Sequence, residues 1–299
     1  MAQLTAEVKP NQQPGLREPV SSPWRDAWRS LRRNRLAMVG LFLILFFVLL
    51  AVFAPLLTRY GYNDQELLNR LQPPSAEHWF GTDDLGRDLF TRVIYGARIS
   101  LWVGFFAVVG SIVAGSLLGI LAGYYGRWVD MLISRFFDIM LAFPAILLAI
   151  AIVAALGPSL QNALLAIAIV NIPTYGRLVR ARVLSLKEEE FIMAARALGM
   201  KDRRILFQHI LPNSLAPLIV QGTLGIGTAI IEAAALGFLN LGAQPPEPEW
   251  GKMLSDSRQF IQTAPWTLFF PGLSIMLTVL GFNLVGDGLR DALDPRMKH

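Results

Sequence analysis

The stretch SLKEEEFIMAARALGMKDRRILFQHILPN, residues Ser185 to Asn213, determines how the rest of the chain is organised. It is a polar and strongly cationic insert between two long apolar runs, and it carries too many charges to lie in lipid. Ser185 and Glu188 have the spacing of a capping box, which predicts a helix from there to Leu198. Gly199 follows the last periodic residue, where glycine can adopt the left-handed conformation that ends a helix.

This predicted helix has a shallow stripe at helical spacing, made of Phe191, Ala194, Ala195 and Leu198. A second short helix is expected to begin near Asp202 and to stop at Pro212, because proline has no backbone N–H to donate. Two short helices joined by a glycine turn, with alanines that allow close approach, predict a docking site for another protein. The simpler interpretation is a loop that only connects two membrane spans.

The composition is that of a membrane protein. The chain has 299 residues, of which 54% are hydrophobic and only 16% are charged. The net charge of +5 raises the hypothesis of a nucleic-acid partner, which requires basic residues gathered on a solvated face. The chain has no cysteine, which excludes disulfides, thiolate metal sites and a cysteine nucleophile.

Six apolar stretches have about the length that crosses the roughly 30 Å hydrocarbon core. They are residues 36–57, 99–123, 131–156, 159–178, 214–239 and 266–285. The predicted fold class is therefore an all-α integral membrane protein with six transmembrane helices. Glycines along the second stretch, such as Gly115 and Gly119, are expected to let helices pack closely. Pro144 is expected to loosen the third helix without ending it.

The remaining segments complete the predicted organisation. Residues 1–23 contain four prolines and no apolar core, which predicts a disordered tail and not a secretory signal. Residues 24–98 hold a basic interface helix suited to an anionic membrane surface, the first span and an outer polar segment. Residues 99–290 form the main transmembrane domain, and residues 291–299 form a polar tail.

The distribution of positive charge predicts the orientation. With six spans, both ends lie on the same side as the 185–213 loop, and that side carries 20 of the 27 lysines and arginines. The positive-inside rule therefore places both termini and the loop in the cytoplasm. The basic character is explained by topology, so the nucleic-acid hypothesis loses its support.

Two residues in the predicted spans are candidates for lining a translocation path, Glu232 and Asn283. A carboxylate at mid-bilayer costs roughly 2.5 to 3.5 kcal/mol, so a deep glutamate usually faces a cavity or a partner. The alternative for Glu232 is a hydrated position near the interface.

The outer segments contain polar residues with two possible roles. Thr82 and Asp83 can cap an amphipathic helix that begins near Leu85, and capping also explains Asp84 and Asp88 without a metal, since the EF-hand pattern is missing. No metal site is predicted. Residues 242–265 contain three closely spaced prolines, which predict an extended, stiff loop before Trp250.

Motifs for catalysis are missing from the sequence. The nearest match to a phosphate-binding loop, Gly251-Lys252, is followed by Met253. There is no HExxH zinc pair and no GxSxG nucleophile elbow. The chain is therefore not expected to be an enzyme or to bind ATP or another cofactor itself.

The run Ala194-Ala195, Gly199 and Leu211-Pro212 resembles the EAA coupling loop in the membrane subunits of ABC importers. The resemblance implies that the loop sits in a groove of a separate ATPase subunit. Met193 stands where the motif usually begins with a glutamate, so an ionic contact from that position is not carried over. The residues assigned to ATPase coupling are Phe191, Ala194, Ala195, Leu198, Gly199, Arg203 and Pro212.

Three longer stretches extend the resemblance over most of residues 24–295. They are FGTDDLGRDLFTRVIYGARISL, ALGFLNLGAQPPEPEWGKMLSD and FNLVGDGLRDALDP, and they are similar to the C-type permease subunit of dipeptide and oligopeptide ABC importers. The resemblance implies a type I ABC importer permease fold in the bacterial inner membrane. It also implies four kinds of partner or ligand: a homologous B-type permease subunit, two ABC ATPase subunits that hold ATP and Mg, a periplasmic substrate-binding protein, and the lipid bilayer.

The expected function is to form half of a translocation path for dipeptides, with alternating access driven by ATP on the partner subunits. The family resemblance places binding-protein contact or gating at Gln244, Pro246 and Trp250. Alternative cargoes within the family are oligopeptides, nickel and haem. An ion-coupled secondary transporter would carry inverted repeats, and none is convincing here. A lone channel would conduct without ATPase partners.

Overall fold

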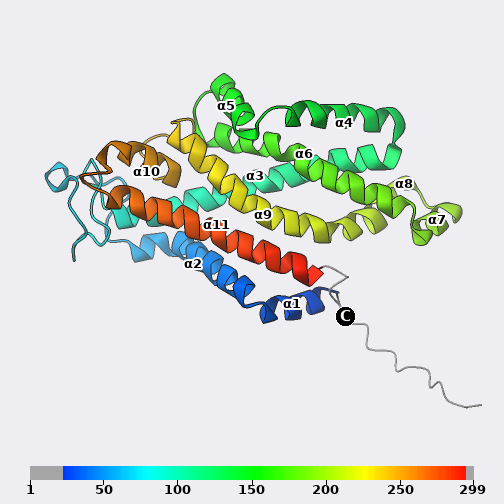
Figure 1. Cartoon of the computed structure of the whole chain (residues 1–299), viewed down its shortest axis with the longest axis horizontal. Helices are drawn as coiled ribbons and strands as arrows, with labels where there is room; N and C mark the ends of the chain where they lie inside the picture. Colours follow the sequence, from blue (N-terminus) through cyan, green and yellow to red (C-terminus); the bar gives the residue numbers. More distant parts are fainter. Residues whose placement is uncertain (1–22, 294–299) are drawn as a thin grey trace, which may run out of the picture.

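The computed structural model describes residues 23–293, and the long elements in that part of the chain are helices packed side by side (Figure 1). The helices are α1 (Pro23–Arg33), α2 (Arg35–Leu57), α3 (Leu89–Tyr125), α4 (Arg127–Leu141), α5 (Ala145–Leu156), α6 (Leu160–Lys187), α7 (Glu190–Ala197), α8 (Asp202–Ile205), α9 (Leu211–Phe238), α10 (Trp250–Ser257) and α11 (Trp266–Leu293). The tails predicted at residues 1–23 and 291–299 lie almost wholly outside the described residues, since Pro23 begins α1 and Leu293 ends α11.

Within residues 23–293, five helical stretches are long and apolar enough to cross a membrane, and a bent pair makes a sixth. The five are α2, α3, α6, the continuous stretch Asp202–Phe238, and α11. The bent pair is α4 and α5, whose axes differ by 92°. The predicted fold class, all-α with six spans, is confirmed.

The third span is broken, which the prediction of a merely loosened helix missed. Pro144 is the residue immediately before α5, and its backbone is extended, with φ −56° and ψ 129°. Proline also disfavours helical geometry in the residue before it, so α4 cannot continue through Phe143 into α5. Both halves keep exposed apolar side chains, including Leu132 at 64% and Leu147 at 58% exposure.

Helix α3 is the longest single helix, and its start differs from the prediction. It begins at Leu89, where Asp88 caps the first turn by accepting a hydrogen bond of 2.8 Å from the Thr91 N–H. Asp83 closes the preceding turn instead and pairs with the Arg87 guanidinium at 2.7 Å. The separate amphipathic helix expected from Leu85 is therefore wrong, because those residues form a turn and the first turns of α3.

Close contact between α3 and α6 joins the centre of the bundle. A Cβ atom added at Gly119 would lie 2.4 Å from the Gly176 carbonyl oxygen of α6. A Cβ atom added at Gly115 would lie 2.7 Å from the Ile172 carbonyl oxygen, and one added at Gly123 would lie 2.8 Å from the Val183 side chain. Glycines four residues apart therefore let two backbones approach each other, as the sequence predicted.

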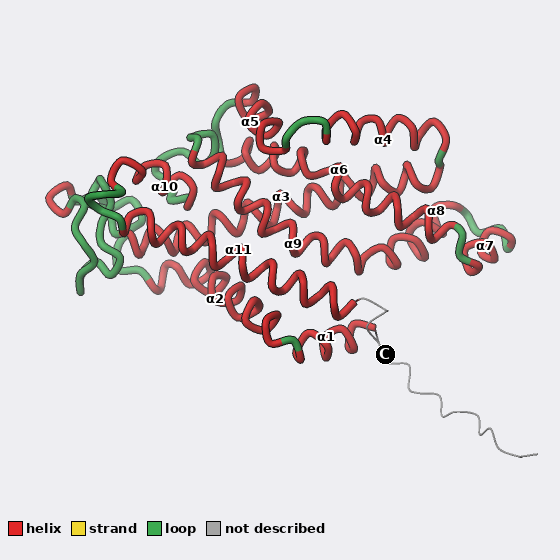
Figure 2. Tube along the Cα trace, viewed as in Figure 1, coloured by secondary structure: helices red, strands yellow, loops and turns green. Residues whose placement is uncertain are grey.

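The two ends of the bundle differ in character. α7 and α8 lie at one end, and α1 and the last turns of α11 point toward that same end (Figure 1). The opposite end holds α10, and Figure 2 shows the longest loops gathered there. α1 packs against α11, with Leu31 buried at 5% exposure. The fold thus separates one end with short helices from one end with long loops.

The chain before Trp250 is a loop, as the prolines predict, and helix α10 begins at Trp250. Its N-cap is Glu249, which accepts hydrogen bonds from the backbone N–H groups of Gly251 and Lys252, both at 2.8 Å. Trp250 is fully buried and donates from Nε1 to the Val93 carbonyl oxygen of α3 at 2.9 Å. The sequence did not indicate this helix, which a capping glutamate and a buried indole stabilise after the prolines.

Substitution of Gly119 by alanine is expected to destabilise the bundle. The added Cβ would meet backbone, which cannot rotate away, so the expected loss in the free energy of unfolding is about 1–3 kcal/mol. Gly110→Ala is the matched control, since its Cβ would lie 3.4 Å from the Ala168 side chain in ordinary contact. The thermal midpoint of the detergent-solubilised protein measures both, and equal midpoints would contradict the tight α3–α6 contact.

A pH dependence is expected from Glu249. Burial raises the pKa of this carboxyl from 4.5 to about 7, although hydrogen bonds from the backbone N–H groups of Gly251 and Lys252 oppose the shift. The folded state therefore holds a proton that the unfolded state releases, and stability falls as the pH rises from about 4.5 to about 7. Glu249→Gln should remove this pH-dependent loss of stability. The thermal midpoint of the variant minus that of wild type should therefore rise between pH 5 and pH 8. Glu247→Gln is the control, and parallel midpoint curves for Glu249→Gln and wild type would refute the assignment.

Candidate coupling loop and translocation path

The loop between α6 and α9 begins later than the sequence predicted. α6 continues to Lys187, so Ser185 lies inside it, and the capping box with Glu188 is not formed. Val183 and Leu186 are buried on the face that α6 turns toward the bundle, and this packing carries the helix past the polar cap sequence. α7 then begins at Glu190, and its N-cap residue makes no side-chain cap hydrogen bond.

The end of α7 is as predicted. Gly199 has φ +76°, its N–H donates to the Arg196 carbonyl oxygen at 2.9 Å, and the Met200 N–H donates to the Ala195 carbonyl oxygen at 3.1 Å. This pair of bonds is the Schellman motif, which satisfies carbonyls that a helix end leaves free. The glycine turn of the loop is therefore confirmed in conformation.

The second short helix does not stop at Pro212. α8 passes into a π turn, Leu206–Ile210, and then directly into α9, where Pro212 is among the first residues. Proline cannot bond to the carbonyl four residues earlier, and a wider turn relieves the clash between its ring and that carbonyl. The predicted end of the helix is wrong, because the local widening lets the chain remain helical into the fifth span.

The loop has one face against the protein and one face outward. Ile192, Ile205 and Ile210 are fully buried and hold the loop on the bundle. Leu198 is 85% exposed and Phe191 is 45% exposed, although both are large and apolar. The other residues assigned to coupling divide as follows: Ala194, Gly199, Arg203 and Pro212 are exposed, whereas Ala195 is buried at 7% exposure.

A surface hollow adjoins the outward face. It is lined by Lys201, Arg203, Arg204, Phe207 and Gln208. Phe207 is 59% exposed between these cations. An apolar ring beside several positive charges is suited to a partner surface that offers both an apolar residue and carboxylates.

Tyr124 at the end of α3 ties this loop to the bundle, and no sequence pattern pointed to it. Its hydroxyl donates to the Asp202 carboxylate at the start of α8. The Arg196 guanidinium of α7 lies 5.2 Å from the centre of its ring. Lys187 at the end of α6 donates to the Tyr124 carbonyl oxygen at 2.9 Å. One buried residue therefore contacts α6, α7 and α8. Spacing along the chain could not predict this, because Tyr124 lies 78 residues before Asp202.

Glu232 forms a contact between two helices. Glu232 of α9 accepts a hydrogen bond of 2.9 Å on Oε2 from Asn171 of α6. Within residues 23–293, no lysine, arginine or histidine nitrogen lies within 4.0 Å of its carboxylate. Asn171 is a second polar residue in a span, which the sequence analysis did not single out.

The other path candidate, Asn283, lies on α11 and faces a different side of α9. It is an exposed residue of α11, and its side-chain oxygen would be 3.4 Å from a Cβ atom at Gly227. Gly227 precedes Glu232 by five residues, which is about 140° around a helix. The structure therefore does not bring Asn283 and Glu232 to the same side of α9.

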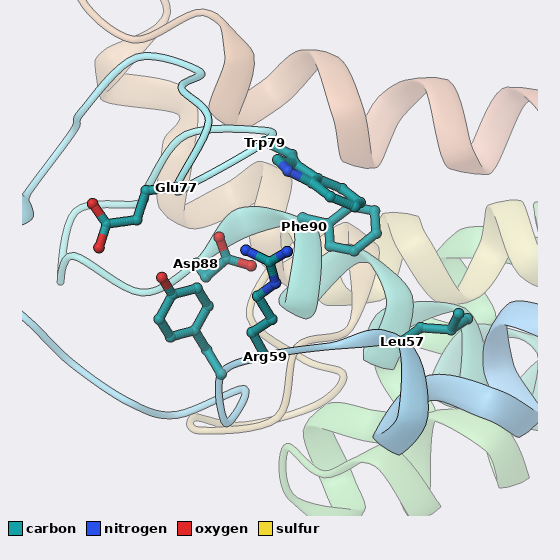
Figure 3. A pocket seen from close by; sticks show the side chains of 7 residues that line it. Leu57, Arg59, Glu77, Trp79, Asp88 and Phe90 are labelled. Atoms are coloured by element: carbon teal, nitrogen blue, oxygen red, sulfur yellow. The ribbon is translucent and has the colours of Figure 1, made fainter.

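The outer candidates separate by exposure. Gln244 and Pro246 are exposed, whereas Trp250 is fully buried and offers no surface to a partner in this structure. A hollow at the same end is lined by Leu57, Arg59, Tyr60, Glu77, Trp79, Asp88 and Phe90 (Figure 3). Within it the Arg59 guanidinium lies 5.9 Å from the centre of a Trp79 ring. Among the residues that the structure describes, no group of three His, Cys, Asp or Glu side chains could hold a metal ion.

Comparison with known proteins defines the class. Residues 115–299 match the family described as "Binding-protein-dependent transport system inner membrane component", and residues 22–74 match the "N-terminal TM domain of oligopeptide transport permease C". The chain belongs to this family of ABC importer permeases and is a multi-pass inner-membrane protein.

Individual relatives agree with this assignment. The chain is 74% identical over 277 residues to the dipeptide transport system permease protein DppC of Alkalihalophilus pseudofirmus, covering 93% of this chain and 91% of that protein. It is 50% identical to the glutathione transport system permease protein GsiD of Escherichia coli, covering 97% and 94%. The inward-facing MetNI methionine ABC transporter shares the fold, with a TM-score of 0.55 at 20% identity over 69% of this chain and 98% of that one.

Replacing Gly199 is expected to loosen the end of α7. Valine at φ +76° costs about 1–2 kcal/mol in backbone strain, although the space around the residue is open. Hydrogen exchange of the Gly199 and Met200 region should therefore accelerate in Gly199→Val. Asparagine tolerates the left-handed conformation, so Gly199→Asn should exchange nearly as wild type does. Identical exchange in both variants would argue against strain at this turn.

Proposed function

We propose that this chain is the C-type permease subunit of an ATP-driven importer of dipeptides and forms half of the translocation path. The observation that carries the proposal is the 74% identity to a dipeptide permease over nearly the whole of both chains. The loop between α6 and α9 supports it, because buried isoleucines hold it rigidly while Leu198 and Phe191 remain outward for a partner.

The proposed assembly contains a homologous B-type permease, two ABC ATPase subunits and a periplasmic substrate-binding protein. ATP and Mg bind to the ATPase subunits, and this chain is non-catalytic and holds no cofactor. The exposed Phe191, Ala194, Leu198 and Arg203 contact a groove of an ATPase subunit. Gln244 and Pro246 contact the binding protein at the other end, and Trp250 supports them from the interior.

The proposed orientation places the α7–α8 end in the cytoplasm. Positive charge favours this arrangement, since 20 of the 27 lysines and arginines lie in segments assigned to that side. Both termini are then cytoplasmic as well, because α1 and the end of α11 point toward the same end of the bundle (Figure 1). ATP binding then moves the loop from the cytoplasmic side.

The proposed mechanism is alternating access. Closure of the ATPase subunits shifts α7, and Tyr124 transmits the shift to α3 because its ring contacts α7 and its hydroxyl bonds to α8. α3 packs along α6 at its glycines, so the two helices move together and open the path outward. Hydrolysis of ATP returns the path to its inward-facing state.

The choice of dipeptides as cargo is the most specific part of the proposed function. The glutathione permeases at 50% identity make a tripeptide-sized cargo the leading alternative, ahead of longer oligopeptides, nickel or haem. An ion-coupled transporter would move cargo without ATP.

The test is reconstitution of the complete complex in liposomes with the binding protein and internal ATP. Uptake of labelled dialanine should require ATP and should exceed uptake of glutathione. Gly199→Val should reduce uptake or co-purification with the ATPase subunits, and Gly199→Asn should retain both. Uptake without ATP would overturn the proposed ATP-driven transport. A preference for glutathione would overturn the proposed dipeptide cargo.

A further inference from the structure

We propose that Glu232 is the site in the translocation path that receives the free α-ammonium group of the peptide. This inference rests on the proposed function, because it concerns how the same path recognises its cargo. It assigns to one carboxylate a defined chemical partner, a primary ammonium.

The negative charge of Glu232 has no cationic partner among the residues that the structure describes. Its Oε2 atom accepts from Asn171 at 2.9 Å, and no hydrogen bond to Oε1 is made within residues 23–293. Asn171 also donates to its own helix, at the Ile167 carbonyl oxygen, so its amide group orients Glu232 without neutralising it. A carboxylate held in place with one free oxygen is a site for a further hydrogen-bond donor that carries positive charge.

The helix faces beside Asn171 and Glu232 carry exposed hydroxyl groups. Thr174, one turn from Asn171 on α6, is exposed, and so is Thr228, one turn from Glu232 on α9. A carboxylate in a span avoids lipid, so this face borders water or a partner subunit.

The experiment uses the complete complex in liposomes, with the binding protein loaded with dialanine. Glu232→Gln keeps an oxygen that accepts from Asn171 but removes the charge, and Glu232→Asp keeps the charge on a shorter side chain. Loss of a charge-assisted hydrogen bond should lower uptake about tenfold or more in Glu232→Gln and less in Glu232→Asp. The control is Thr223→Val on the same helix, whose hydroxyl bonds only to its own backbone at the Ile219 carbonyl oxygen, and its uptake should be near wild type.

A second measurement separates recognition of the ammonium from a structural role. The ratio of dialanine uptake to N-acetyl-dialanine uptake, each normalised to loading of the binding protein, should fall toward one in Glu232→Gln. ATP hydrolysis stimulated by the loaded binding protein, and co-purification with the other subunits, should be retained.

Three outcomes would overturn the inference: unchanged uptake in Glu232→Gln, an unchanged uptake ratio, or loss of subunit co-purification, which would make Glu232 a contact to the partner permease. If the wild-type complex imports dialanine but Glu232→Gln behaves as wild type, only this inference fails. If the wild-type complex imports no peptide, the proposed function fails and this inference fails with it.

Discussion

The close approach of the α3 and α6 backbones is the contact on which the rest of the structure depends. Lipid tails are as apolar as leucine, so helices in a membrane associate through packing and not through hydrophobic burial. Gly115, Gly119 and Gly123 remove the side chains that would keep the two helices apart. Because α3 runs unbroken from Leu89 to Tyr125, this seam joins the polar segment before α3 to the loop at the other end of the bundle.

That continuity explains how two distant ends can act together. At one end, Asp88 caps α3 and Trp250 bonds to the Val93 carbonyl oxygen, so α10 is fixed to the same helix. At the other end, Tyr124 contacts three helices around the loop. The α4–α5 pair is broken by 92° and exposes apolar side chains, so it is the less continuous part of the bundle. A rigid central pair beside a broken span is an arrangement that can transmit a displacement without deforming throughout.

The incorrect predictions share a cause. The capping box at Ser185, the stop at Pro212 and the helix start at Leu85 were each inferred from local chemistry. Buried packing of Leu186 carried α6 past its cap, and a π turn carried the chain into α9. Local sequence patterns predicted the structure correctly where no tertiary contact competed with them. Gly199 is an example, because no neighbouring atoms crowd it and its left-handed backbone conformation alone forms the turn.

Hydrophobic length, charge distribution and the glycine turn determined from sequence alone that this is a six-span membrane protein with a cationic loop, since these depend on composition and on near neighbours. Its family could also be predicted, because Ala194-Ala195 and Gly199 form a short contiguous pattern. Only the tertiary structure decided that Glu232 meets Asn171, that Tyr124 secures the loop and that Trp250 is interior. Each of these contacts joins residues that are 61 or more positions apart, and their distance in space is set by how the helices pack and not by any period along the chain.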